Sequence, residues 1–135
     1  GFSSPGEPTP GLYALDIETG ERRWKYSRGS RCPDLECVFG FSAAIIASND
    51  IVVAGSMDGI LEVIAAESGK RLWSHDSWRD YRSVNNVVTS GGAFDAHGAM
   101  IADDLLLVSS GYSYVGQQRG GNAFLVFQIG VDDEQ

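Results

Sequence analysis

Residues 11–24 read GLYALDIETGERRW, and residues 60–73 read ILEVIAAESGKRLW. The two stretches align at a spacing of 49 residues, which matches Gly20 with Gly69 and Trp24 with Trp73. A third and shorter copy, GNAFLVFQ, occupies residues 121–128 and has no tryptophan after it. An internal repeat at a fixed spacing predicts a chain built from repeated structural units.

Each full copy has the pattern of a β-hairpin. Its apolar run, such as Leu12–Asp16, has the length of a strand rather than of a helix. Glu-Thr-Gly and Glu-Ser-Gly are turn sequences, because glycine supplies the positive φ that such turns need. The returning strand ends in Trp24 or Trp73, a large aromatic side chain that favours burial. We interpret both tryptophans as packing anchors.

Two further strands precede the second hairpin and the third copy. We expect them at residues 41–47 and 51–55, and again at residues 98–102 and 105–110, with tight turns at Asn49-Asp50 and Asp103-Asp104. Four antiparallel strands that recur about every 50 residues are typical of a β-propeller blade. The sequence therefore predicts an all-β fold, a β-propeller fragment of four-stranded antiparallel blades.

The predicted organisation is incomplete as a propeller. We expect residues 1–10 to be a linker, 11–26 half a blade, 41–74 a complete blade, 75–97 a long loop on the functional face, 98–128 an incomplete last blade, and 129–135 a tail. A closed propeller needs about four blades or more. We therefore expect the chain to be the C-terminal portion of a larger protein, with the remaining blades of that protein as its partners. The longer connections share one face, where function usually resides.

Composition excludes two classes of function. The chain of 135 residues carries 10 basic and 18 acidic side chains, a net charge of −8. Binding of nucleic acid phosphates requires clustered Lys and Arg, so we expect no nucleic-acid partner. No apolar run approaches the ~20 residues of a membrane-spanning helix, so we expect no membrane span.

Cys32 and Cys37 are the only cysteines, and they are too few for a Cys/His metal site. We expect a local disulfide between them, which places the protein in an oxidising compartment; two free buried thiols are the alternative. A periplasmic or secreted protein follows from the disulfide.

The ordered motifs resemble one family, the pyrroloquinoline-quinone (PQQ) dehydrogenases with tryptophan-docking repeats, and within it the polyvinyl-alcohol-dehydrogenase-like branch. Besides the repeats, the resemblance rests on five motifs: Cys-Pro-Asp with Cys-Val-Phe-Gly-Phe-Ser-Ala in residues 32–43, Val-Asn-Asn-Val in 84–87, Gly-Gly-Ala-Phe-Asp in 91–95, Ser-Ser-Gly-Tyr in 109–112, and Gly-Asn-Ala-Phe-Leu-Val-Phe in 121–127. It covers nearly all of residues 11–128.

The resemblance implies a quinoprotein that oxidises alcohol groups, small or polymeric, by hydride transfer to PQQ, with Ca²⁺ in the site and an electron acceptor such as a cytochrome c. The resemblance points to Asp95 as the catalytic base and to Asn85 and Asp95 as metal ligands. Cofactor contacts are then expected from Trp78, which is suited to stacking, from the carboxylate-binding Arg79, and from Asn85, Gly91 and Gly92.

Several side chains of the functional face leave alternatives open. Asn85 and Asp95 equally suit turn capping. Arg79 and Arg82 suit solvated surface positions. His75 and His97 are candidate bases but also ordinary loop histidines, and Tyr112 and Tyr114 suit either a substrate mouth or a blade edge. For the whole protein, a non-catalytic propeller that acts as a binding or assembly scaffold is the alternative to the enzyme.

Overall fold

The computed structural model describes residues 10–31, 39–48, 50–113 and 118–130, and the regular elements in these ranges are all β-strands. The eleven strands are β1 (Leu12–Leu15), β2 (Arg22–Tyr26), β3 (Ile46–Ala47), β4 (Ile51–Gly55), β5 (Ile60–Ala65), β6 (Arg71–Asp76), β7 (Asp80–Arg82), β8 (Val88–Ser90), β9 (Met100–Ala102), β10 (Leu105–Ser110) and β11 (Ala123–Gln128). The prediction of an all-β fold is confirmed.

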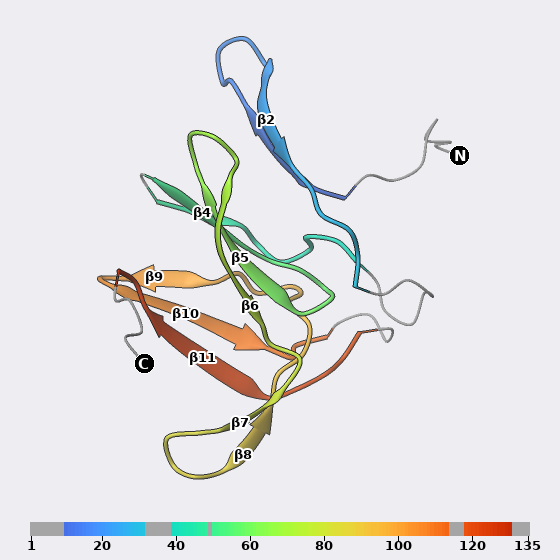
Figure 1. The fold of residues 1–135 in the computed structure, drawn as a ribbon, viewed down its shortest axis with the longest axis vertical. Coiled ribbons are helices and arrows are strands. Elements are labelled where there is room, and N and C mark those ends of the chain that lie inside the picture. Colours follow the sequence, from blue (N-terminus) through green and yellow to red (C-terminus); the bar gives the residue numbers. More distant parts are fainter. Residues whose placement is uncertain (1–9, 32–38, 49, 114–117, 131–135) are drawn as a thin grey trace.

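The strands form antiparallel sheets that follow one another like the blades of a propeller. Figure 1 shows the pair β1–β2, the four-stranded sheet β3–β4–β5–β6 and the three-stranded sheet β9–β10–β11 in this order. We call them blade 1, blade 2 and blade 3. Every strand pairs with its neighbour in the chain, so each blade is a simple meander.

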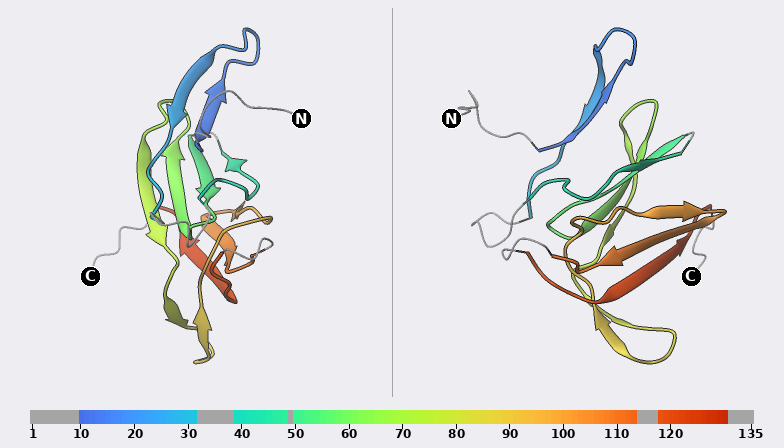
Figure 2. Two further views of the ribbon diagram at one scale, coloured as in Figure 1. Left: turned by 90° about the vertical axis from the view of Figure 1, so that its right-hand side faces the viewer. Right: turned by 180° about the vertical axis from the view of Figure 1, so that it is seen from behind.

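Two predicted segments differ from the observed ones. The strand expected at residues 41–47 is short, because β3 comprises only Ile46 and Ala47. The backbone before it serves other contacts: the Gly40 carbonyl accepts a hydrogen bond from Met57 N (2.9 Å). The segment expected as one long loop, residues 75–97, contains the end of β6 and a separate hairpin, β7–β8, which projects beyond blade 3 (Figures 1 and 2).

Blades 1 and 2 pack through a first seam. Its buried apolar residues are Leu12 of β1, Ala54 of β4 and Ile64 of β5, flanked by Trp24 and Tyr26 of β2. The Trp24 indole N–H donates to the carbonyl of Ala66 (2.8 Å), in the turn after β5. The interpretation of this tryptophan as a packing anchor agrees with this geometry.

Blades 2 and 3 pack through a second and more apolar seam. Its buried residues are Ala43, Val53, Leu61, Phe94, Leu106, Val108, Ala123 and Leu125. Trp73 of β6 lies edge-on against Phe127 of β11, with ring centroids 5.0 Å apart. Trp73, like Trp24, therefore contacts the next blade along the chain.

Candidate functional site

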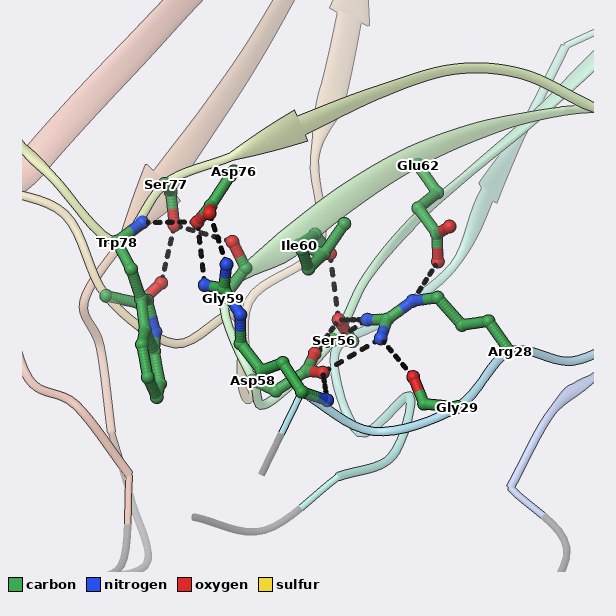
Figure 3. Close-up of polar contacts among 12 residues, drawn as sticks. Arg28, Gly29, Ser56, Asp58, Gly59, Ile60, Glu62, Asp76, Ser77 and Trp78 are labelled. Carbon is green, nitrogen blue, oxygen red and sulfur yellow. Dashed lines mark hydrogen bonds and ion pairs between the residues drawn. The ribbon is translucent and has the colours of Figure 1, made fainter. Parts of the chain in front are cut away.

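A buried ion cluster joins the β2–β3 connection to blade 2 (Figure 3). The Arg28 guanidinium donates to both carboxylate oxygens of Asp58 (2.6 and 2.8 Å), to Glu62 Oε2 (3.0 Å) and to Ser56 Oγ (2.7 Å). Asp58 and Glu62 are 0% exposed, and the Arg28 side chain is 15% exposed. Tyr26 donates a short hydrogen bond to the other oxygen of Glu62. The cluster thus spans the first seam.

The cluster shifts the pKa values of Asp58 and Tyr26. Burial raises the pKa of the Asp58 carboxyl, but hydrogen bonds from Arg28 and Ser56 outweigh it and hold this pKa below its usual value. Burial and the hydrogen bond to Glu62 raise the pKa of Tyr26 to about 12. At neutral pH the arginine and the Asp58 carboxylate are charged and the phenol remains a donor.

A second ion pair lies beside the first. Arg31 binds both carboxylate oxygens of Asp76, which also accepts from Trp78 N (2.9 Å). The Arg31 guanidinium carbon lies 4.9 Å from the Trp78 ring centroid, and that of Arg119 lies 5.9 Å from it. On Gly59, an added Cβ would come 2.2 Å from Trp78 Cδ1, so the indole rests directly on the glycine backbone. Trp78 is thus held by residues of this chain.

The glycine pair Gly91-Gly92 permits close backbone packing. An added Cβ on Gly91 would lie 2.1 Å from the Ser77 carbonyl oxygen, and one on Gly92 would lie 2.2 Å from that of Arg119. The Ser77 hydroxyl oxygen lies 2.6 Å from the Gly92 carbonyl oxygen. The space that the missing side chains leave is therefore occupied by neighbouring backbone.

Asn85 and Arg79 belong to the projecting hairpin. Asn85 lies in the exposed turn between β7 and β8, where its Oδ1 accepts a hydrogen bond from Ser83. Arg79 donates from Nε to the Asp76 carbonyl (3.0 Å) and lies over the Tyr81 ring. Both side chains thus make contacts within or next to their own hairpin.

Asp95 occupies a different position, beyond β8 and next to blade 2. It is 5% exposed, and its Oδ1 accepts from Ala96 N (2.9 Å). Ala96 has φ +33°, a conformation that a residue with a Cβ rarely adopts. His97 lies edge-on against Tyr112, with centroids 4.8 Å apart, and an added Cβ on Gly98 would lie 2.3 Å from the Ala44 carbonyl oxygen. The buried carboxylate therefore sits in a strained, tightly packed segment.

His75 joins an aromatic cluster rather than an acid–base site. Its ring stacks on Trp73, contacts Phe127 and lies with Nε2 2.8 Å from the Tyr81 hydroxyl. Burial, assisted by the charge of Arg79, lowers the pKa of His75 below its usual value. The neutral ring is therefore favoured at neutral pH.

Three of the predicted site residues lie together, and Asn85 and Asp95 lie elsewhere. Trp78, Gly91 and Gly92 meet around Ser77, whereas Asn85 lies on the hairpin turn and Asp95 follows β8. Cys32, Cys37 and Tyr114 lie outside the described residues. Among the residues that the structure describes, no group of three or more His, Cys, Asp and Glu side chains suits a metal ion. The described residues alone do not form a complete site for PQQ or Ca²⁺, because neighbouring backbone fills the space at Gly91 and Gly92.

Sequence reasoning missed the ion clusters around Arg28 and Arg31. One signal was present: Glu62 is a charged residue between Leu61 and Val63 in a predicted strand. A glutamate in such a position requires a buried cation, since an isolated buried carboxylate is strongly unfavourable. Its partner, however, lies 34 residues away in the chain. No helix in the described part of the chain is long and apolar enough to cross a membrane.

Comparison with known proteins places these features in a family. A family model described as outer membrane protein assembly factor BamB, of the PQQ-repeat type, matches residues 6–124. The chain is 32% identical over 120 residues to a polyvinylalcohol dehydrogenase of Sphingopyxis sp. (strain 113P3). This alignment covers 83% of the chain and 18% of that protein. It is 33% identical over 132 residues to a polyvinylalcohol dehydrogenase of Pseudomonas sp., and this alignment covers 89% of the chain and 20% of that protein.

A further relative is the quinohemoprotein alcohol dehydrogenase ADH-IIG of Pseudomonas putida, 33% identical over 109 residues, which cover 69% of the chain and 15% of that protein. The chain thus spans about a fifth or less of the length of these curated relatives. The resemblance inferred from the repeats is confirmed: the chain belongs to the PQQ-repeat β-propeller family, as a stretch that is similar to the PQQ-dependent dehydrogenases.

Proposed function

We propose that the chain is part of a PQQ-dependent alcohol dehydrogenase of the polyvinyl-alcohol type. The observation that carries this proposal is the alignment with two polyvinylalcohol dehydrogenases over 83% and 89% of the chain. Alignments that cover 83% and 89% of the chain are too long to be confined to the tryptophan repeats. The whole protein would oxidise small or polymeric alcohols and pass electrons to an acceptor such as a cytochrome c, in the periplasm or outside the cell.

The chain's own contribution to such an enzyme is three packed blades and the buried carboxylate of Asp95. Asp95 is our candidate for the catalytic base and for a calcium ligand, because its burial and the strained backbone beside it fit a preorganised functional group. Asn85 is the second proposed metal ligand, and Trp78, Arg79, Gly91 and Gly92 are the proposed cofactor neighbours. Since the described residues do not form a cofactor site alone, the other blades of the protein must supply most of it.

The decisive experiment titrates the full-length protein with PQQ and Ca²⁺ and measures alcohol oxidation with a reducible dye. We expect binding of the quinone and turnover of polyvinyl alcohol or a short secondary alcohol. Asp95→Asn should lower turnover about 10²-fold or more, the usual contribution of a general base. Asp103→Asn is the matched control, because Asp103 is exposed in a turn with φ +53° and asparagine adopts this conformation readily. Absence of both quinone binding and dye reduction would refute the enzyme.

A scaffold is the second candidate function, favoured by the description of the matching family model as an outer membrane protein assembly factor. The mutual saturation of Arg28, Asp58 and Glu62 also suits a purely structural propeller. This function predicts a full-length protein without PQQ affinity that co-purifies with membrane assembly proteins. If the protein oxidises an alcohol, and Asp95→Asn abolishes this turnover without changing the stability of the protein, the scaffold function is excluded.

A further inference from the structure

The segment that carries Asp95 leads from the interior of the protein to its surface. Residues 91–95 are all buried, whereas the next two residues, Ala96 and His97, are exposed. Asp95 itself is 5% exposed, and its Oδ1 accepts a hydrogen bond from Ala96 N (2.9 Å). A buried carboxylate is therefore followed, two residues along the chain, by a histidine that is open to solvent.

The backbone keeps Asp95 and His97 close to each other. Two residues of chain separate their Cα atoms by at most about 7 Å. The backbone on both sides of His97 is constrained: Ala96 has φ +33°, and an added Cβ on Gly98 would lie 2.3 Å from the Ala44 carbonyl oxygen. The carboxyl group and the imidazole are thus held as neighbours in a segment with little room to move.

Tyr112, which follows β10, holds the imidazole of His97 from the other side. The two rings meet edge to face, with centroids 4.8 Å apart. The backbone around Tyr112 is tied to the segment that precedes His97, because Phe94 and Tyr112 form a parallel bridge and Gly111 N donates to the Ala93 carbonyl (2.8 Å). Tyr112 is 51% exposed, so the two rings meet at the surface.

The described elements that pack against this segment bring one further titratable group to it, the Tyr112 phenol. Residues 39–48, whose Ala44 carbonyl lies against Gly98, have no acidic, basic or histidine side chain in their described positions. The other histidine of the chain, His75, belongs to the aromatic cluster on β6. His97 is therefore the histidine that the fold places next to Asp95.

We propose that His97 is the proton relay of the site: it accepts the proton that Asp95 removes from the alcohol and releases it to the solvent. Tyr112 is a positioning residue, because its ring orients the imidazole. Histidine is the side chain that most readily binds and releases protons near neutral pH. This inference rests on the proposed function, in which Asp95 is the base.

Each turnover leaves one proton on the buried carboxyl group. When the alcohol is oxidised, its O–H and C–H bonds break: the proton passes to Asp95, the C–H electron pair leaves as a hydride to the quinone, and the O–H electron pair forms the C=O bond. Asp95 must lose this proton before it can act on the next alcohol. Since Asp95 is 5% exposed and His97 is exposed, the imidazole provides a short route from the carboxyl group to water, directly or through one bridging water.

The test measures alcohol oxidation by the full-length protein, supplied with PQQ and Ca²⁺, in dilute buffer at pH 7. We expect His97→Ala to lower kcat about tenfold, which is less than the loss at Asp95 because the base itself remains. Imidazole is small enough to enter the vacated space and should restore most of the lost rate, whereas a bulky sulfonate buffer of similar pKa should not. The affinity for PQQ should equal that of the wild type.

Two sets of variants separate the relay from simple packing. Tyr112→Phe keeps the ring contact and should retain turnover, whereas Tyr112→Ala should lower it. His75→Ala is the matched control, because imidazole should restore no rate that this variant loses.

The outcomes distinguish the relay from the proposed function. A wild-type rate for His97→Ala in dilute buffer, or a loss that imidazole does not restore, would overturn the relay while the enzyme stands. A wild-type protein that neither binds PQQ nor oxidises an alcohol would overturn both.

Discussion

Replacement of Arg28 by methionine should lower the free energy of unfolding more than the replacement of any other charged residue that is accessible at the surface. Arg28 makes four hydrogen bonds to Asp58, Glu62 and Ser56, and both carboxylates are fully buried. Methionine preserves the length and packing of the side chain but leaves the two carboxylates without their main cation. A buried ion pair that loses one partner costs about 3–5 kcal/mol.

Two features of the cluster place the expected loss of unfolding free energy at the lower end of this range. Arg71 lies 3.8 Å from Glu62 and still screens that carboxylate. Among the described residues, Asp58 would keep hydrogen bonds from the Ser56 hydroxyl and, at 3.4 Å, from the Arg31 backbone N–H. The Arg28 side chain is 15% exposed, so water can enter the vacated space and limit the penalty. We therefore expect a loss of about 3 kcal/mol in the free energy of unfolding at pH 7.

Urea denaturation followed by circular dichroism measures this loss, with Arg22→Met as the matched control. Arg22 is exposed on β2 and has no ion pair among the described residues, so its replacement should cost less than about 0.5 kcal/mol. The Arg28→Met deficit should shrink as the pH falls toward 4, because Arg28 lowers the pKa of Asp58 in the wild type and this carboxyl gains a proton more readily in the variant. A loss below 1 kcal/mol at pH 7, or one that is independent of pH, would refute the reasoning.

Three further predictions concern other contacts. Gly69→Ala should destabilise the chain by about 1–3 kcal/mol more than Gly20→Ala in urea denaturation, because both glycines have φ +72° but only Gly69 lies against the Trp24 ring; equal losses would contradict this docking. Because the pKa of His75 is lowered in the fold, its neutral ring stabilises the chain above the unfolded pKa of about 6.5, and this contribution is lost as the pH falls below that value. A urea midpoint measured from pH 7 to pH 5 should thus fall further in the wild type than in His75→Phe, and parallel profiles would contradict the assignment. In an alkaline absorbance titration, one tyrosine should ionise near pH 12 and be missing in Tyr26→Phe, whereas ionisation of all tyrosines near pH 10 would contradict the hydrogen bond to the buried glutamate.

The repeat predicted the blades because it records local structure. Gly20 and Gly69 share the same positive φ, and each lies in the turn between two strands, where the sequence has Thr-Gly or Ser-Gly. The hairpin β7–β8 was not predicted, since its strands are three residues each and carry no apolar alternation that distinguishes them from a loop. Their turn depends on Asn86 at φ +64° and on Ser83, whose N–H donates to the Val87 carbonyl.

The candidate site was less accessible to sequence reasoning for a different physical reason. Its residue types, arginine, aspartate and glycine, are the same whether they bind a ligand or one another. Arg28 and Arg31 both look like solvated loop charges in the sequence, yet the fold pairs them with Asp58 and Asp76. Long-range pairing of this kind follows from the stacking of blades, which no local pattern encodes.

The two seams show how one repeat supports different chemistry at equivalent positions. Where the first seam has Tyr26, Arg28 and Glu62, the second has His75, Ser77 and Leu125 in the corresponding places. The apolar seam derives most of its stability from area removed from water. The ionic seam depends on charges that must stay paired because they are buried, and it fixes the orientation of the blades through the directions of its hydrogen bonds.

Since Arg28 precedes β3 in the connection between two blades, its bonds hold the connection itself. The same is true of Arg31, whose partner Asp76 accepts from Trp78 N. The repeat thus builds the frame, and the departures from the repeat fix the connections on the face where functional residues are proposed.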